Sequence, residues 1–132
     1  HHAIPDAQES RGLGDVYKRQ VEGLGMGSQL GFPTANIKLD YDLYLPKFGV
    51  YGITCKIDKK LYEGILNIGI TPTVSDTKNI KIETHIFEFN KNIYGENLVI
   101  HLNQFIRDEI KFSSPEELVK QINIDISKVK NK

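Results

Sequence analysis

The chain has one cysteine, one methionine and no tryptophan, and it has no excess of charge of either sign. A lone cysteine, Cys55, excludes an internal disulfide framework and suits a reducing compartment. Lys plus Arg equals Asp plus Glu at 17 each, which argues against a strong electrostatic footprint for nucleic acid, although a local basic patch remains open. No apolar run reaches membrane-spanning length, and no signal-peptide pattern opens the chain. We expect a soluble, cytoplasmic, globular protein with no membrane partner.

The length of 132 residues corresponds to one domain. Residues 1–16 show no sustained periodicity, and His1 and His2 match the end of an affinity tag better than a metal-binding pair. We therefore expect a disordered or non-native lead-in at 1–16 and a single domain at 17–132, without internal repeats.

Short runs of alternating apolar and polar residues predict several strands. The predicted strands are 17–22, 50–57, 61–70, 80–89 and 98–105. The clearest alternation puts Ile80, Ile82, Thr84 and Ile86 on one face and Lys81, Glu83, His85, Phe87 and Phe89 on the other. Residues 58–60 suit a hairpin, and Thr71 is expected to end the ladder before a loop. Close spacing of strands and turns predicts a closed or nearly closed antiparallel barrel.

The C-terminal segment has the pattern of a helix instead. Ser114 is a candidate N-cap, Pro115 suits the first helical position, and Glu117 follows three residues after the cap. A single apolar stripe then runs along Leu118, Ile122, Ile126 and Val129. We expect this helix on the outside of the barrel, covering an edge or an open end.

A glycine-rich stretch stands near the start of the predicted domain. It holds Gly23, Gly25, Gly27 and Gly31, and Pro33, Thr34 and Asn36 follow. Amides in such a loop can converge on a phosphate, but the stretch lacks the Gly-Lys-Ser/Thr of a Walker loop. From the residues alone, a phosphate cradle and a plain surface turn both remain open, as do local turn-capping roles for Thr34 and Asn36.

Several other residues allow a structural interpretation, a functional one or both. From the residues alone, Glu83 is an exposed strand residue near Lys81. His85 fits a hydrogen-bonded structural residue better than a metal ligand or a proton relay. Arg107 could form a surface ion pair with Asp108 or Glu109. Cys55 alternates with apolar residues and is expected in the core.

Residues 30–36, Leu-Gly-Phe-Pro-Thr-Ala-Asn, resemble the signature of the riboflavin kinase family, the flavokinases that phosphorylate riboflavin to FMN. The resemblance runs from about Gln20 to Asp125. Its matching positions are Asn67-Ile68-Gly69, Pro72-Thr73, Glu83-Thr84-His85, Tyr94-Gly95, Arg107, Lys111-Phe112, Leu118 and the spacing from Gln121 to Asp125. Many members carry Arg where Ser28 and Thr71 stand, and Thr71 removes one potential phosphate or flavin contact.

The resemblance implies a mainly β fold, a six-stranded antiparallel Greek-key barrel with a C-terminal α-helix. It implies transfer of the γ-phosphate of ATP to the ribityl 5′-hydroxyl of riboflavin. Glu83 would be the catalytic base, and Thr34 and Asn36 would hold Mg²⁺ together with the phosphates.

It further implies where the two substrates bind. The nucleotide would contact Gly23, Gly25, Gly27, Gly31, Pro33, Thr34, Asn36 and Tyr94. The flavin would contact Arg107 and Phe48. Without the resemblance, the residue types of Tyr94-Gly95 fit a plain β-turn equally well.

Two other functions are weighed against the kinase. One is a non-catalytic flavin- or nucleotide-binding barrel, a truncated part of a bifunctional FAD synthetase; the other is a barrel for single-stranded nucleic acid, which the neutral charge disfavours. Bacterial members usually carry an upstream FMN adenylyltransferase module. Only the kinase half is expected in these residues, with fusion to or partnership with that module in the natural protein.

Overall fold

The computed structural model describes residues 16–24, 32–37, 46–71, 79–89, 91 and 93–131. The elements in these ranges are β1 (Val16–Leu24), β2 (Ala35–Ile37), β3 (Gly49–Ile57), β4 (Lys60–Thr71), β5 (Asn79–Ile86), β6 (Asn97–Arg107) and α2 (Pro115–Lys130). The expected lead-in lies outside the described residues, except for Val16, which begins β1.

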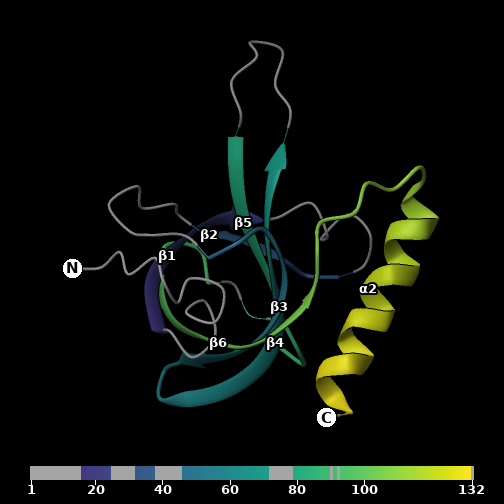
Figure 1. The fold of residues 1–132 in the computed structure, drawn as a ribbon. Coiled ribbons are helices and arrows are strands. Elements are labelled where there is room, and N and C mark those ends of the chain that lie inside the picture. The colour runs from purple at the N-terminus through teal and green to yellow at the C-terminus, as the bar shows by residue number, and fades with distance from the viewer. Residues whose placement is uncertain are drawn as a thin grey trace.

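The six strands form a closed antiparallel barrel in the order β1-β2-β5-β4-β3-β6, and β6 pairs back onto β1 (Figure 1). Strands β3, β4 and β5 follow one another along the chain, and β6 lies beside β3, which is the Greek-key arrangement. Helix α2 lies outside the barrel. The predicted Greek-key barrel with a C-terminal helix is confirmed.

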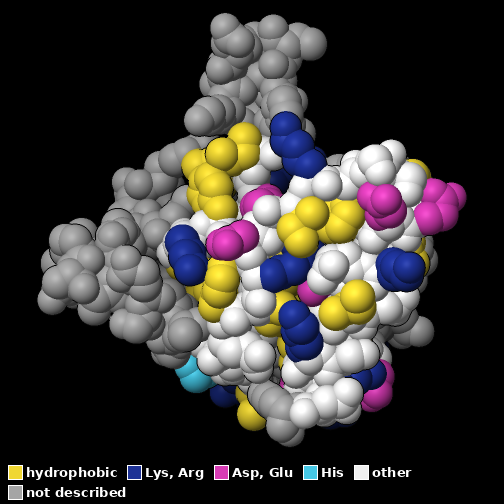
Figure 2. Space-filling model, turned by 45° about the vertical axis from the view of Figure 1, so that its right-hand side comes forward, with side chains coloured by type: hydrophobic (Ala, Val, Ile, Leu, Met, Phe, Trp, Pro, Cys, Tyr) yellow, Lys and Arg dark blue, Asp and Glu magenta, His cyan; other side chains and the backbone are white. Residues whose placement is uncertain are grey.

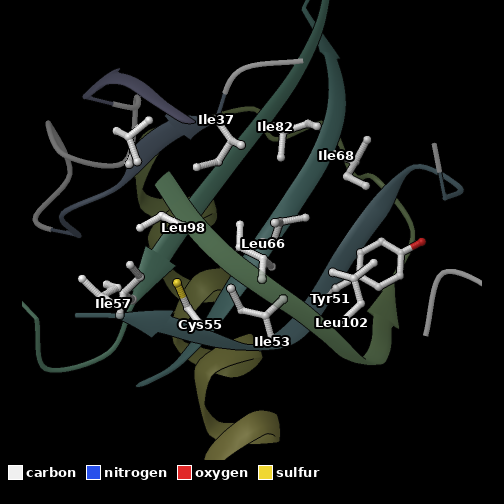
Figure 3. Packing of buried hydrophobic residues seen from close by; sticks show 14 residues of the cluster. Ile37, Tyr51, Ile53, Cys55, Ile57, Leu66, Ile68, Ile82, Leu98 and Leu102 are labelled. Atoms are coloured by element: carbon white, nitrogen blue, oxygen red, sulfur yellow. The ribbon is translucent and has the colours of Figure 1, made fainter. Parts of the chain in front are cut away.

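The barrel interior is filled by alternate side chains from all six strands (Figure 3). Ile53, Leu98, Ile100 and Leu102 are almost completely buried there. Cys55 is also fully buried, and desolvation raises the pKa of its thiol to about 12. The thiol is therefore neutral at physiological pH, and the prediction that Cys55 is a core residue is confirmed.

The hairpin predicted at residues 58–60 joins β3 to β4, although Lys60 already belongs to β4. Asp58 and Lys59 connect the strands with φ of 50° and 71°. Two central residues with positive φ match the right-handed twist of the flanking strands. The end of β4 differs from the prediction, because Thr71 is still in the ladder and pairs with Asn79.

Strand β5 is shorter than its alternating pattern predicts, because a turn follows Ile86. Glu88 in this turn has a φ of 55°. Phe87 keeps the outer side that the alternation predicts and packs with Val129 of α2, whereas Phe89, beyond the turn, packs against the barrel core. The prediction that Phe87 and Phe89 share a strand face was wrong, because a turn can carry the same alternation of residue types as a strand.

Helix α2 begins as predicted and packs outside the barrel. The Ser114 hydroxyl oxygen accepts a hydrogen bond of 3.2 Å from the Glu117 amide, which caps the first turn. Val129 packs with Val50 and Ile65 against the outer face of the barrel. The expectation that the helix covers an edge or an open end was wrong, because the barrel is closed and the helix packs on this outer face.

Gly64 in β4 lies where the two strands β4 and β5 approach closely. A Cβ at this position would meet the main-chain carbonyl oxygen of His85 at less than 3.0 Å. We expect Gly64→Ala to lower the free energy of unfolding by about 1–3 kcal/mol, because a main-chain oxygen moves only with its strand. Chemical denaturation measures this loss. Gly95→Ala should cost only about 1 kcal/mol of strain, because φ there is 82° and an added Cβ would meet no described atom within 4 Å. Equal stability of Gly64→Ala and wild type would contradict the close approach.

The described surface on the helix side carries both signs of charge interspersed, and hydrophobic side chains lie in separate small groups between them (Figure 2). No described helix combines the length and the hydropathy that a bilayer crossing requires.

Candidate functional site

One transverse row of paired residues passes through all six strands and organises the site. The consecutive pairs are Gly23 with Asn36, Asn36 with Glu83, Glu83 with Asn67, Asn67 with Val50, and Val50 with Arg107. Paired residues of neighbouring strands project to the same face of a sheet. Residues from the N-terminal, middle and C-terminal parts of the chain are thereby brought into one line.

This row faces outward. In β4, Leu66 and Ile68 belong to the barrel core, so Asn67 between them must lie on the outer face. The same alternation in β5 places Ile82 inside and Glu83 outside. A hollow of about 180 Å³ lies over the row, and Thr34, Glu83, Asn67 and Arg107 contribute to its lining. Leu118 and Ile122 of α2 line the same hollow.

Thr34, Asn36 and Glu83 form the polar end of this site. Asn36 and Glu83 are direct cross-strand partners, for which Cβ atoms lie about 4.5–5.5 Å apart. Thr34 Oγ1 and Asn36 Oδ1 are both shielded from solvent. Two neutral oxygens thus lie next to one carboxylate, which is a suitable arrangement for a cation-bound phosphate beside a proton acceptor.

His85 anchors the segment that carries Thr34. Its Nδ1 lies 2.7 Å from the carbonyl oxygen of Pro33. A carbonyl oxygen only accepts hydrogen bonds, so Nδ1 carries the proton. Phe32 and Phe87 contact the ring, with ring centroids 5.8 Å and 5.6 Å from that of His85. The structure therefore supports the expected structural role of His85, which is to fix the turn that enters β2.

Arg107 at the other end of the row is held by a buried carboxylate. Its Nε and Nη2 donate hydrogen bonds of 2.8–3.0 Å to the two carboxylate oxygens of Asp125 in α2. The Asp125 side chain is 1% exposed and that of Arg107 is 13% exposed. Gln121 Nε2 donates a further hydrogen bond of 3.0 Å to Asp125. The main ion pair of Arg107 is thus this buried pair across to the helix and not a surface pair, and Asp108 accepts a hydrogen bond from Arg107 through its main-chain oxygen.

The residues that would hold Mg²⁺ fit such an ion. Mg²⁺ prefers oxygen ligands and keeps several waters, so the Thr34 and Asn36 oxygens would suffice together with substrate phosphates. Within the described ranges, no three His, Cys, Asp or Glu side chains gather as a metal site. A cation at this place would therefore depend on the nucleotide for most of its ligands.

The remaining predicted site residues lie apart from the hollow or outside the described residues. Gly25, Gly27 and Gly31 are outside them. Phe48 packs against the barrel core, and Tyr94 is 69% exposed in a turn. The amide of the next residue, Gly95, donates a hydrogen bond of 2.9 Å to the Val21 carbonyl, so this turn lies against β1 just before the glycine-rich stretch. The roles of Phe48 and Tyr94 stay predictions.

Sequence reasoning assigned no role to two residues that the structure places in the site. Asp125 interrupts the apolar stripe between Ile122 and Val129, and a charged residue at such a position signals a buried partner. Asn67 lies between two core residues of β4 and gives no comparable signal, because an Asn on the outer face of a strand is unremarkable until its neighbours are known.

Comparison with known proteins agrees with this geometry. The family model for flavokinases, described as riboflavin kinase, matches residues 15–132. A bifunctional riboflavin kinase/FMN adenylyltransferase from Listeria monocytogenes is 37% identical over 105 residues, which is 80% of this chain and 33% of that protein. The chain therefore spans about a third of that relative's length.

Solved structures show the same fold. A crystal structure described as a macrolide-efflux protein from Streptococcus pneumoniae has a TM-score of 0.82 at 31% identity, covering 98% of this chain and 42% of that one. A riboflavin kinase from Trypanosoma brucei has a TM-score of 0.59 at 27% identity, covering 88% of this chain and 78% of that one. Since the family model covers residues 15–132 and thus all of the described residues, this chain belongs to the riboflavin kinase family.

Proposed function

We propose that this chain transfers the γ-phosphate of ATP to the ribityl 5′-hydroxyl of riboflavin, giving FMN and ADP. The observation that carries the proposal is the direct pairing of Asn36 with Glu83, with Thr34 lining the same hollow. Membership of the riboflavin kinase family supports the choice of both substrates.

In this proposal, Glu83 accepts the proton of the 5′-hydroxyl as that oxygen attacks the γ-phosphorus. The new O–P bond forms while the bond between the γ-phosphorus and the bridging oxygen breaks, and ADP leaves with the electron pair. The transition state of phosphoryl transfer is loose, so holding the two reactants in line does most of the work. A general base contributes about 10²–10⁴ in rate.

Thr34 and Asn36 hold the nucleotide end of the reaction. Mg²⁺, when bound there, would neutralise charge that develops on the phosphate oxygens. His85 keeps the Pro33 carbonyl in place and so fixes the position of Thr34. The glycine-rich stretch, with Gly23 paired to Asn36 at its start, would provide main-chain amides for the phosphates, and Tyr94 would lie on the same side.

The apolar end of the hollow suits the flavin. Val50, Leu118 and Ile122 provide apolar contact area there, and Arg107 has a planar guanidinium that can stack on or hydrogen-bond to a ring system. The predicted flavin contact of Phe48 would need its side chain, which packs against the barrel core, to reach the hollow from the loop before β3. In this proposal, the sugar-alcohol chain lies near Glu83, between the ring system and the γ-phosphate.

The direct test incubates the purified chain with riboflavin and MgATP and separates the flavins by chromatography. The proposal predicts time-dependent FMN and an equal amount of ADP. Flavin binding without FMN would instead support the non-catalytic binding barrel.

Thr34→Ala should raise the KM for ATP about 10-fold, because the variant lacks one oxygen at the proposed metal site. Steady-state kinetics with varied MgATP measure this change. Thr54→Ala is the matched control, because Thr54 Oγ1 accepts its 2.7 Å hydrogen bond from Asn103, outside the hollow. It should lower stability without changing the KM for ATP. An unchanged KM in Thr34→Ala would contradict the assignment.

The curated relative from Listeria monocytogenes carries both riboflavin kinase and FMN adenylyltransferase in its name. We therefore include in the proposal that the natural protein is fused to, or works with, a module that adenylylates FMN. We place the reaction in the cytoplasm, where ATP is available.

A further inference from the structure

We propose that the carboxamide of Asn67 binds a secondary hydroxyl of the acceptor's sugar-alcohol chain and selects substrates that carry it. The inference rests on the proposed phosphorylation of riboflavin, because that function supplies the polyol. It concerns a residue between the proposed base and the apolar end of the hollow.

The first observation is the state of the Asn67 side chain. Its Oδ1 atom is buried, and no hydrogen-bond partner for it occurs among the residues that the structure describes. A buried oxygen without a partner is costly, and native structures rarely keep one unless a ligand or another group satisfies it. Asn67 also lines the hollow that contains Glu83, so a bound ligand can reach it.

The second observation is its place in the row. Asn67 pairs directly with Glu83 on one side and with Val50 on the other. The acceptor therefore passes Asn67 on its way from the carboxylate to the apolar contacts. Neighbouring strands lie about 4.8 Å apart, so Asn67 lies one strand spacing from the proposed base.

A hydroxyl is also the chemical group that suits this site. It can donate to the amide oxygen and accept from the amide nitrogen, so it satisfies either end of the carboxamide. A second role as ligand of the ion at Asn36 does not fit. Asn36 and Asn67 lie two strands apart, roughly 10 Å, whereas two ligands of one Mg²⁺ each approach it to about 2.0–2.1 Å.

The consequence is selectivity. With riboflavin bound, the Asn67 oxygen gains its partner; with an analogue that lacks the relevant hydroxyl, it stays buried and unsatisfied. Sites built to bind a substrate hydroxyl discriminate strongly against analogues without it, for this reason.

The test is a cycle of protein and ligand changes, read by equilibrium titration of flavin fluorescence. The ligands are riboflavin and a series of analogues, each lacking one secondary ribityl hydroxyl. For wild type, one analogue should bind about 10-fold more weakly than riboflavin. Asn67→Ala should bind riboflavin about 10-fold more weakly, and it should not distinguish riboflavin from that same analogue.

Asn103→Ala serves as the matched control. Asn103 donates a 2.7 Å hydrogen bond to Thr54, and neither residue lines the hollow. This variant should lose stability and keep the wild-type preference among the ligands. Asn67→Ala should keep the melting temperature of the ligand-free wild type, because the change also removes an unsatisfied buried oxygen.

The inference is overturned if Asn67→Ala binds riboflavin as tightly as wild type, or if it weakens all ligands equally and keeps the wild-type preference. Failure of the proposed function is separate, because that shows as absence of FMN from wild-type protein, whereas the titration needs no turnover.

Discussion

Glu83→Gln should lose about 10²–10⁴ of the rate of FMN formation and keep most of its affinity for riboflavin and MgATP. The amide has nearly the shape of the carboxylate, so it preserves the lining of the hollow, but it cannot take up the proton of the attacking hydroxyl. The loss should therefore appear in kcat, with little change in KM. Initial rates at saturating substrates, with flavin binding measured in parallel, separate the two effects.

Glu88→Gln is the matched control for this prediction. Glu88 lies in the turn just after β5, and its side chain is 85% exposed and 4.0 Å from the Lys130 ammonium. The same chemical change at this place should leave kcat unaltered, because Glu88 does not line the hollow. A Glu83→Gln enzyme with the wild-type kcat would show that Glu83 is not the base.

Asp125→Asn should lower the free energy of unfolding by about 3–5 kcal/mol, the loss expected when one partner of a buried ion pair is removed. Arg107 would then keep its charge at a largely buried place without the carboxylate that now accepts its hydrogen bonds. A domain of this size has about 5–15 kcal/mol of stability in total, so the effect is large. Urea denaturation at neutral pH measures it.

Asp108→Asn provides the comparison. Arg107 Nη1 donates to the main-chain oxygen of Asp108, at 3.2 Å, so changing that side chain leaves the bond in place. It should alter stability by less than about 0.5 kcal/mol. If Asp125→Asn were as stable as Asp108→Asn, the buried pair would not hold α2 and β6 together.

The barrel was largely predictable because its strands alternate and because its hairpin and helix have strong local signals. Three local signals agree with the tertiary structure: the hairpin expected near Asp58, the Ser114 cap and the apolar stripe ending at Val129. The end of β5 was not predictable in this way. The Phe87 amide still donates a hydrogen bond of 2.8 Å to the Glu63 carbonyl of β4, and the positive φ of Glu88 then turns Phe89 toward the barrel core.

The site residues that belong to a short sequence motif were predictable, and those brought together only by tertiary packing were not. The resemblance pointed to Thr34, Asn36 and Glu83, and strand register then brought Asn36 and Glu83 together. The buried partner of Arg107 was not foreseen, because nothing in residues 105–109 indicates that the guanidinium turns toward a helix 18 residues later. Asn67 is a candidate substrate-binding residue only because the strand register places it between Glu83 and Val50.

The central claim is that a nucleotide-bound cation lies beside Asn36 and Glu83, on the outer face of the barrel. Paramagnetic broadening of backbone amide signals by Mn²⁺ with ADP, in isotope-labelled protein, tests this most directly. The account predicts the strongest broadening at residues 34–36 and 82–84 and almost none at the Asp58 hairpin. Broadening centred on that hairpin, with 34–36 and 82–84 unaffected, would contradict it.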